Sequence, residues 1–378
     1  MKAEAPTARQ VLARRLNRQA DGCESLGSPL YSSLLRAAAS DLDVGTAVWG
    51  VLAGFESEPG TAALALRLMG AVHRLVLTGR LPNAARHYPS AGGDGDADAA
   101  WHAFRDALVE QRSEIRHLIA RGCQTNEVGR SAALLGGFLD VAHRTGLPLR
   151  ILEIGASAGL NLRWDRYRYE SGAVAWGDPA SPVRFIDYFE APPPLLSEAA
   201  WQLPSPARGG GAGVGVDVQV IERQGCDLDP IDPTSAEGSL ALRSFIWADQ
   251  KDRFKLLEGA IAVALELPVE VERLDAAGFL ERELAAPSSG AATVVYHSVF
   301  MQYVGEVGRR RIAQALEEAA ARSTVQAPVA WLRMEPAGGS FEVRLNLWPG
   351  GAEELVAVAR AHGTGVRWLG PHSYRDNP

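Results

Sequence analysis

The spacing of apolar residues divides the chain into a first part that predicts helices and a second part that alternates. Up to about residue 148, apolar residues recur every three to four positions, which is typical of helices. The expected helices cover 8–20, 30–39, 62–77, 101–120 and 129–145. The range 62–77 is apolar nearly all round, so we expect a buried helix in which His73 is a hydrogen-bonded core residue. The motif Gly146-Leu147-Pro148 then ends the last of these helices.

From residue 149 onwards, short apolar runs alternate with helical patterns, which favours an α/β fold with a mostly parallel sheet of the Rossmann-like type. Strands are expected over 149–154, 216–221, 269–273, 292–298 and 328–334, and helices over 249–266, 276–286 and 305–322. Two further strands are expected at 341–348 and 365–369, whereas 352–361 fits a helix or a strand. We therefore divide the chain into an all-helical N-terminal region, 1–148, and an α/β domain, 149–378.

An unusually long insertion, about 163–213, separates the first two expected strands. Its aromatic-rich segments 167–169 and 183–188 are expected to pair as a hairpin, because both have the composition of short strands.

Composition and charge narrow the class of protein. The chain has 378 residues, with 47% hydrophobic and 22% charged residues, and a formal net charge of −7, which gives no general attraction to nucleic acid or to an anionic membrane. The three cysteines are far apart, which fits a reducing compartment. No signal peptide and no apolar run of about 20 residues stand out. We expect a cytoplasmic protein with a small-molecule substrate and no nucleic-acid or membrane partner; the oligomeric state is not indicated.

The loop after the first strand, Glu153-Ile154-Gly155-Ala156-Ser157-Ala158-Gly159, matches two different patterns. As E-x-G-x-x-x-G it resembles the cofactor-binding loop of S-adenosylmethionine-dependent methyltransferases. As G-x-S-x-G it matches the nucleophile elbow of α/β-hydrolases, with Ser157 as nucleophile. The two patterns predict different chemistry at the same position.

The nucleotide interpretation accounts for more of the surrounding sequence. Small residues in the loop let the backbone approach a ligand, and the following helix would offer free N–H groups. Glu153 would accept a hydrogen bond from a cationic amine. Glu222, at the end of the second expected strand, would bind ribose hydroxyls. Asp275, after the third, would bind the adenine amine or would only cap the helix 276–286.

Other polar residues are expected at the same edge of the sheet. His297, at the end of the fourth expected strand, is the candidate general base or substrate-binding histidine, with Tyr303 close by. Asn126 and Arg130 precede the first strand and would line the cofactor pocket. Alternatively, Asn126 would cap a helix and Arg130 would form a surface ion pair. No metal site is indicated.

Two alternatives remain open, and a third is disfavoured. A serine hydrolase would use Ser157 with Asp275 and with His297 or His362, but the loop follows the first strand and no oxyanion-hole motif precedes it. A nicotinamide dehydrogenase is disfavoured, because it would need G-x-G-x-x-G and an acid about 20 residues later, whereas this loop is G-x-x-x-G and an insertion separates it from Glu222. A non-catalytic ligand-binding or interaction protein on a degenerate methyltransferase fold would keep the loop without the reaction.

Several longer motifs together resemble a known bacterial family, domain of unknown function 2332. The motifs that carry the resemblance extend over nearly the whole chain: His87-Tyr88-Pro89-Ser90, Gln124-Thr125-Asn126-Glu127 with Arg130, the segment 222–233, Ile246-Trp247-Ala248-Asp249-Gln250, His297-Ser298 with Tyr303, and Ala361-His362-Gly363. Ala248 departs from the proline expected there. The resemblance implies a class I methyltransferase-like fold, although the family has no established reaction.

These observations together predict an S-adenosylmethionine-dependent methyltransferase that acts on a small molecule. The expected catalytic residues are His297 and Tyr303. The expected cofactor-binding residues are Glu153, Gly155, Ala156, Ser157, Gly159, Asn161, Glu222, Asp275, Asn126 and Arg130.

Overall fold

The computed structural model describes residues 6–196 and 218–370. The chain forms two compact units. The helical unit consists of Met1–Thr125 and Ser235–Lys255, and the α/β unit consists of Asn126–Thr234 and Leu256–Pro378. Each unit therefore contains two separate stretches of sequence.

The helical unit is built from short amphipathic helices. Their bounds are α1 (Ala8–Ser25), α2 (Pro29–Val44), α3 (Ala47–Leu52), α4 (Leu64–Leu77), α5 (Pro82–Ala85), α6 (Ala97–Glu110), α7 (Arg112–Ala120) and α9 (Ala236–Ser244). Helix α1 begins with a capping box, in which Thr7 and Gln10 each bond the other's backbone N–H. The single helix expected over 101–120 is two helices, because Gln111 leaves the helical conformation, with φ −107° and ψ 24°.

His73 lies in the core of the helical unit, as the sequence predicts. It is fully buried. Its Nδ1 atom lies 3.1 Å from the carbonyl oxygen of Ser244, and its Nε2 atom lies 2.7 Å from the hydroxyl of Ser90. Burial lowers the pKa of His73 to about 4, so the ring is neutral at physiological pH.

Helix α4, which carries His73, is long and mostly apolar. Within the described residues, Gly60–Leu77 is the one segment long and apolar enough to cross a membrane by length and composition alone, and 61% of it is buried inside the structure. The core helix of a folded unit meets the same test.

The segment 235–255, which the sequence analysis assigned to the α/β domain, belongs to the helical unit. The ring of Phe245 lies against Gly70 of α4, where an added Cβ would come within 2.9 Å of it. Asp249 accepts hydrogen bonds from the hydroxyl of Ser28 at 2.6 Å and from the N–H of Leu30 at 3.1 Å, at the start of α2. These contacts fix the Trp-Ala-Asp-Gln motif to the N-terminal helices. Helix α10 (Lys251–Glu266) carries the chain back to the α/β unit.

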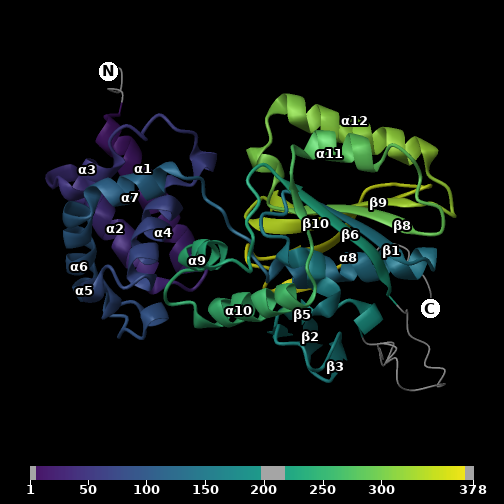
Figure 1. The fold of residues 1–378 in the computed structure, drawn as a ribbon, viewed down its shortest axis with the longest axis horizontal. Helices are drawn as coiled ribbons and strands as arrows, with labels where there is room; N and C mark the ends of the chain where they lie inside the picture. Colours follow the sequence, from purple (N-terminus) through teal and green to yellow (C-terminus); the bar gives the residue numbers. More distant parts are fainter. Residues whose placement is uncertain (1–5, 197–217, 371–378) are drawn as a thin grey trace. The chain divides into compact units, whose positions relative to one another are not determined.

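The α/β unit contains a nine-stranded sheet (Figure 1). Its strands are β1 (Leu149–Ile154), β5 (Phe189–Ala191), β6 (Val220–Asp227), β7 (Val271–Arg273), β8 (Ala292–Ser298), β9 (Val329–Ala337), β10 (Ser340–Trp348), β11 (Glu354–Ala359) and β12 (Val366–Trp368). Their order is β5-β12-β11-β10-β9-β8-β1-β6-β7. The five strands from β7 to β9 are parallel, and β9 to β12 are antiparallel neighbours. The mostly parallel sheet is confirmed, and the ambiguous range 352–361 contains a strand.

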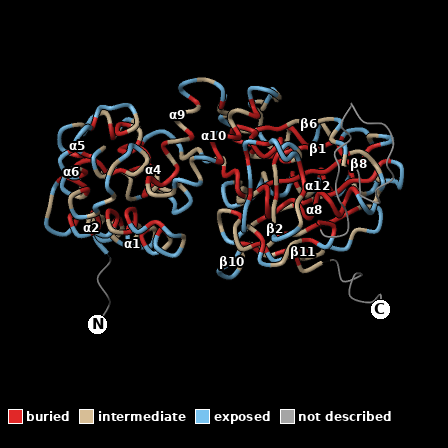
Figure 2. Tube along the Cα trace, turned by 90° about the horizontal axis from the view of Figure 1, so that it is seen from below, coloured by how far each residue is buried: buried red, intermediate tan, exposed pale blue. Residues whose placement is uncertain are grey.

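Helices cover both faces of the sheet. Helices α11 (Ala276–Glu283) and α12 (Glu306–Arg322) lie on one face and α8 (Arg130–Thr145) lies on the other (Figure 1). Phe138 of α8 packs edge-on against Tyr296 of β8, with ring centroids 5.0 Å apart. Figure 2 shows the buried residues concentrated along the central strands and α8. The sequence analysis placed α8 in the N-terminal region, but the helix packs on the sheet and so belongs to the α/β unit.

The described part of the insertion forms a small second sheet of β2 (Arg168–Ser171), β3 (Val174–Trp176) and β4 (Arg184–Ile186), in the order β3-β2-β4. The expected hairpin between 167–169 and 183–188 is wrong, because β2 and β4 run parallel. The hairpin lies between β2 and β3, which Gly172 joins with a positive φ of 57°.

Candidate functional site

The carboxyl ends of β1, β6 and β8 meet at one edge of the sheet, and the order of strands reverses there. From β1 the chain goes on to β6 on one side, and later returns to β8 on the other. In open α/β sheets, ligands bind outside the carboxyl ends of the strands at such a reversal. This edge is therefore the candidate site, and the loop after β1 lies in it.

The loop after β1 needs its two glycines for conformation and for packing. Gly155 and Gly159 have positive φ values of 68° and 65°. A Cβ atom on Gly155 would lie 2.1 Å from the ring of Phe300, and one on Gly159 would lie 2.7 Å from Val271. Because side chains of the protein itself fill these positions, the glycines by themselves do not define a ligand cradle. Ala156, between them, is also buried.

Glu153 is the unusual group at this edge. Its carboxyl group is 2% exposed and accepts one hydrogen bond, from the hydroxyl of Tyr296 at 3.2 Å. Burial raises the pKa of Glu153 to about 8, and the nearby charge of Asp227 adds to the rise, whereas Arg163 and Arg130 oppose it. The Glu153 carboxyl group is therefore mostly protonated at pH 7, because the protein does not compensate its ionised form for the loss of hydration.

Asp227, which the sequence analysis missed, is the acid at the end of the second parallel strand. Its Oδ2 atom accepts a hydrogen bond from the N–H of Ser157 at 2.9 Å, and its Oδ1 atom accepts one from the N–H of Asp229 at 2.9 Å. It therefore joins the loop after β1 to the loop after β6. A carboxylate has about four acceptor positions, so two of them remain for a ligand.

The expectation that Glu222 follows the end of the second strand is wrong. The expected strand 216–221 begins outside the described residues, and β6 extends to Asp227, so Glu222 lies inside the strand. Its Oε1 atom pairs with Arg150 at 3.0 Å. The apolar run indicated the strand but not its end, because Arg223 and Gln224 interrupt the hydrophobic pattern without ending the hydrogen bonding with β1.

Asp275 has the capping role that the sequence analysis left open. It accepts a hydrogen bond from the N–H of Gly278 at 3.1 Å and so caps α11. Its carboxylate also lies 3.4 Å from Arg311 on α12. Both interactions belong to the packing of these helices.

The segment before α8 meets the loop after β1, as the sequence analysis expected. Asn126 accepts a hydrogen bond from the N–H of Leu160 at 2.8 Å. Asn161 donates to the carbonyl of Glu127 at 3.3 Å and accepts from the hydroxyl of Ser131 at 2.8 Å. The two asparagines therefore hold one loop against the other.

Two arginines also bond the loops at this edge of the sheet. Arg130 donates to the carbonyl of Ser298, after β8, at 3.2 Å. Arg163, which the sequence analysis missed, is 2% exposed and donates to the carbonyl of Gly159 at 2.8 Å. An arginine on a segment that looks like a polar insertion carries no sequence signal of burial.

His297 does not share the face of Glu153. Glu153 pairs in register with Tyr296, so both side chains lie on the α8 face. Successive residues in a strand point to opposite faces, and His297 therefore points to the face covered by α11 and α12. There it lies near the ring of Trp331, with centroids 6.0 Å apart. His297 and Glu153 therefore lie on opposite faces of the sheet, and the expected role of His297 toward a substrate stays a prediction.

On that face, His297 belongs to a buried cluster around Glu335. The Oε1 atom of Glu335 lies 2.9 Å from Nδ1 of His297 and accepts the N–H groups of Phe300 at 2.8 Å and Met301 at 3.1 Å. The Nε2 atom of His297 is buried and has no hydrogen-bond partner among the described residues. Tyr303, the other expected catalytic residue, ends the short helix Met301–Tyr303 and is 58% exposed.

The hydrolase alternative gains no support from this arrangement. Ser157 is 5% exposed, its N–H is bonded to Asp227, and its carbonyl accepts the N–H of Ile231 at 3.1 Å. A histidine base would have to bond the serine hydroxyl. The free nitrogen of His297 is unpartnered within the described chain and lies on the opposite face.

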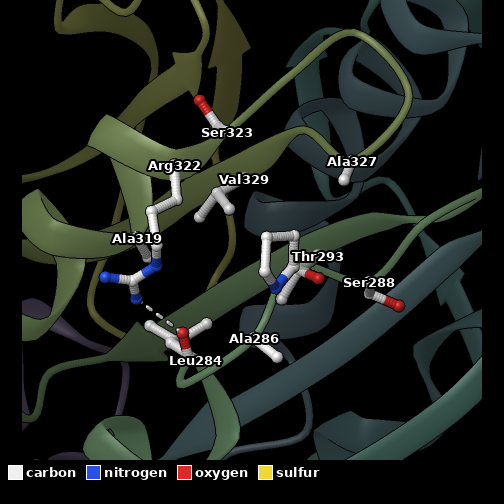
Figure 3. A pocket seen from close by; sticks show the side chains of 10 residues that line it. Leu284, Ala286, Ser288, Thr293, Ala319, Arg322, Ser323, Ala327 and Val329 are labelled. Carbon is white, nitrogen blue, oxygen red and sulfur yellow. Dashed lines mark hydrogen bonds between the residues drawn. The ribbon is translucent and has the colours of Figure 1, made fainter.

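Other candidate chemistry is also absent from the described residues. No group of three His, Cys, Asp or Glu side chains could hold a metal ion in that part of the chain. Burial raises the pKa of each of Cys23, Cys123 and Cys226 to about 12, so these thiols stay protonated. A cavity near Thr293 and Val329 lies at the amino ends of β8 and β9, away from the candidate edge, and its volume of about 10 Å³ suits a single water molecule (Figure 3).

The fold and the site define a mixed α/β protein with a large, mostly parallel sheet and a buried acid at its strand-reversal edge. The model of the bacterial family described as "Uncharacterized protein conserved in bacteria (DUF2332)" matches residues 13–368, and the chain belongs to this family. No curated protein and no solved structure matches the chain.

Proposed function

We propose that the α/β unit binds S-adenosylmethionine and transfers its methyl group to a small molecule. The observation that carries the proposal is Glu153, a buried carboxyl group with a pKa of about 8 at the carboxyl edge of β1. A group of this kind is stabilised by a cation brought in by a ligand. The amino group or the sulfonium of S-adenosylmethionine would supply that charge.

The strand order supports a Rossmann-like fold of the class I methyltransferase type. Strands β7-β6-β1-β8-β9 follow the order 3-2-1-4-5 of doubly wound nucleotide-binding sheets. The antiparallel strands β10 to β12 extend the sheet beyond that order. The proposal therefore uses only the parallel half of the sheet.

Different residues at this edge would bind different parts of the cofactor. Glu153 would face the cationic part of the cofactor, and the two remaining acceptor positions of Asp227 would receive ribose hydroxyls. Asn126, Asn161 and Arg163 hold the loop in place through its backbone. Glu222 and Asp275 have no part in this arrangement.

Methyl transfer makes modest demands on the protein. When bound, the cofactor supplies an electrophilic methyl group on a sulfonium. The chain then has to align a nucleophilic acceptor with that group and exclude water. His297 lies on the other face of the sheet, so we assign it no proton-transfer role.

The test is calorimetric titration of the full chain with S-adenosylmethionine and with S-adenosylhomocysteine. We expect Asp227→Asn and Glu153→Gln each to weaken binding at least tenfold. Glu222→Gln is the matched control, because it also removes one strand carboxylate, and it should bind like the parent chain. Absence of binding by well-folded parent protein, or equal losses in Asp227→Asn and Glu222→Gln, would overturn the proposal.

Proton release gives a second readout. If the cofactor's cation lowers the pKa of Glu153, binding at pH 7 releases part of a proton, and the measured heat then depends on the ionisation enthalpy of the buffer. Comparing parent chain with Glu153→Gln removes the contribution of the ligand's own amine. An unchanged proton release in the variant would remove Glu153 from the site.

A further inference from the structure

A second pocket, open to solvent, is lined only by residues of the helical unit and plays no part in the proposed function. Its volume is about 150 Å³. Four residues of α1 line one side: Arg15, Arg18, Gln19 and Gly22. Small and apolar residues of the segment 59–65 line the other side, and no carboxylate is among the lining residues. The cavity therefore has basic and amide donors on one wall and no acid to neutralise them.

The two arginines lack the carboxylate partner that some other arginines of this unit have. Arg67, for comparison, pairs with Glu58 at 2.6 Å. Within the described part of the chain, neither Arg15 nor Arg18 makes an ion pair, and the Nη1 atom of Arg15 is buried without any hydrogen-bond partner. The two residues are three positions apart on one helix and so lie on the same side of it. A buried guanidinium donor with no acceptor is costly unless a ligand supplies the acceptor.

The opposite wall includes the start of helix α4. The helix has 14 residues, and its N-cap Ala63 takes a left-handed conformation, with φ 50° and ψ 40° and no side-chain cap. The first-turn N–H groups of an α-helix have no intrahelical acceptor and carry the positive end of the helix dipole. The start of α4 therefore lines one side of the pocket, and half-buried Arg15 and exposed Arg18, which form no ion pair within the described chain, line the other.

We propose that this cavity binds a phosphate group, either free or as the ester of a small metabolite. Guanidinium groups match the planar, bidentate geometry of phosphate oxygens, and a helix start adds backbone donors. Gln19 contributes an amide whose one acceptor among the described residues is the weakly accepting sulfur of Cys23, at 3.7 Å. The volume is below that of a typical pocket for a drug-sized ligand, so the cavity takes only the anionic group of a small molecule.

The first test titrates the full chain with inorganic phosphate at low ionic strength, without S-adenosylmethionine. We expect Arg15→Gln to weaken phosphate binding at least tenfold. Arg14→Gln is the matched control: it removes the same charge from the same helix, at an exposed position outside the cavity, and should change the affinity less than twofold. A parallel titration with methyl phosphate distinguishes the two sources, since tighter binding of the ester identifies a phosphorylated metabolite.

The second test fills the cavity without changing charge. Gly22 lies in α1, where an added Cβ would meet only Gln19, at 3.8 Å. Gly22→Leu should therefore fold, because leucine is a better helix former than glycine, and should abolish phosphate binding. The proposal is overturned if the parent chain binds no phosphate, if Arg15→Gln and Arg14→Gln lose affinity equally, or if Gly22→Leu still binds with the parent affinity.

Discussion

The helical unit and the α/β unit each contain a buried titratable group, and the two groups differ in how far the protein satisfies their polar atoms. His73 in the helical unit has a partner for each ring nitrogen and is neutral, so its burial is complete without a ligand. Glu153 in the α/β unit has one hydrogen bond, to Tyr296, and the neighbouring charge of Asp227 acts against its ionisation. Burial of a titratable group therefore does not by itself indicate function. A buried group whose polar atoms lack enough hydrogen bonds or opposite charges from the protein is the better indicator.

The largest expected effect is on Glu153 and depends on pH. Because the pKa of Glu153 rises from 4.5 to about 8 on folding, its contribution to stability is fully present below about pH 4.5 and is lost as the pH rises through 8. Glu153→Gln, which cannot ionise, should be more stable than the parent chain by on the order of 3 kcal/mol at pH 8 and about equal to it at pH 5. Urea unfolding at both pH values measures the difference.

A pH-independent difference between Glu153→Gln and the parent chain would contradict this interpretation. It would mean that folding does not raise the pKa of Glu153, so that the protein compensates its ionised form. The comparison between the two units would then lose its basis.

The second prediction concerns His73. His73→Ala should lower the free energy of unfolding by about 2 kcal/mol, because it leaves a cavity and removes two buried hydrogen bonds. Hydrogen exchange in α4 should accelerate, while binding of S-adenosylmethionine stays the same. A variant with parental exchange in α4 would show that the histidine is dispensable to the core.

The third prediction concerns the Glu335 cluster. Burial opposes ionisation of Glu335, but the hydrogen bonds from His297, Phe300 and Met301 outweigh it and lower the pKa. The resulting stability is present above about pH 4.5 and is lost as the pH falls below that value. Glu335→Gln should cost about 1.5 kcal/mol at pH 7 and less at pH 4. Equal losses at both pH values in urea unfolding would exclude this role.

The smallest expected effect tests the cap on α11. Asp275→Ala should destabilise the α/β unit by about 1 kcal/mol and speed hydrogen exchange in the first turn of α11. Affinity for S-adenosylmethionine should not change, whereas Asp275→Asn should restore most of the stability. A tenfold loss of affinity in Asp275→Ala would return this residue to the cofactor site.

The sequence predicts most elements of the parallel sheet but not every end. The run 292–298 coincides with β8, because valine-rich buried strands have a clear pattern. The predicted end of β6 is several residues too early, because the polar side chains near the carboxyl end of this strand resemble those of a loop. That error moved the candidate acid from Asp227 to Glu222.

Only the parts of the candidate site that depend on local sequence were predictable. The loop Gly155 to Gly159 and the contact of Asn126 with it follow from local pattern and position. The face on which His297 lies depends on its register with β1, which needs the pairing of Glu153 with Tyr296. The helix break at Gln111 and the transfer of 235–255 to the helical unit depend on tertiary contacts that no local pattern encodes.

That transfer has a consequence for how the protein is made. During synthesis, the first 125 residues leave the ribosome without the segment that supplies Ser244 to His73 and Asp249 to α2. The helical unit can complete its core only after residue 255 has emerged, when β1 and β6 already exist. Domains commonly fold one after another as they are synthesised. Here the N-terminal helices must wait for the middle of the chain before their core is complete.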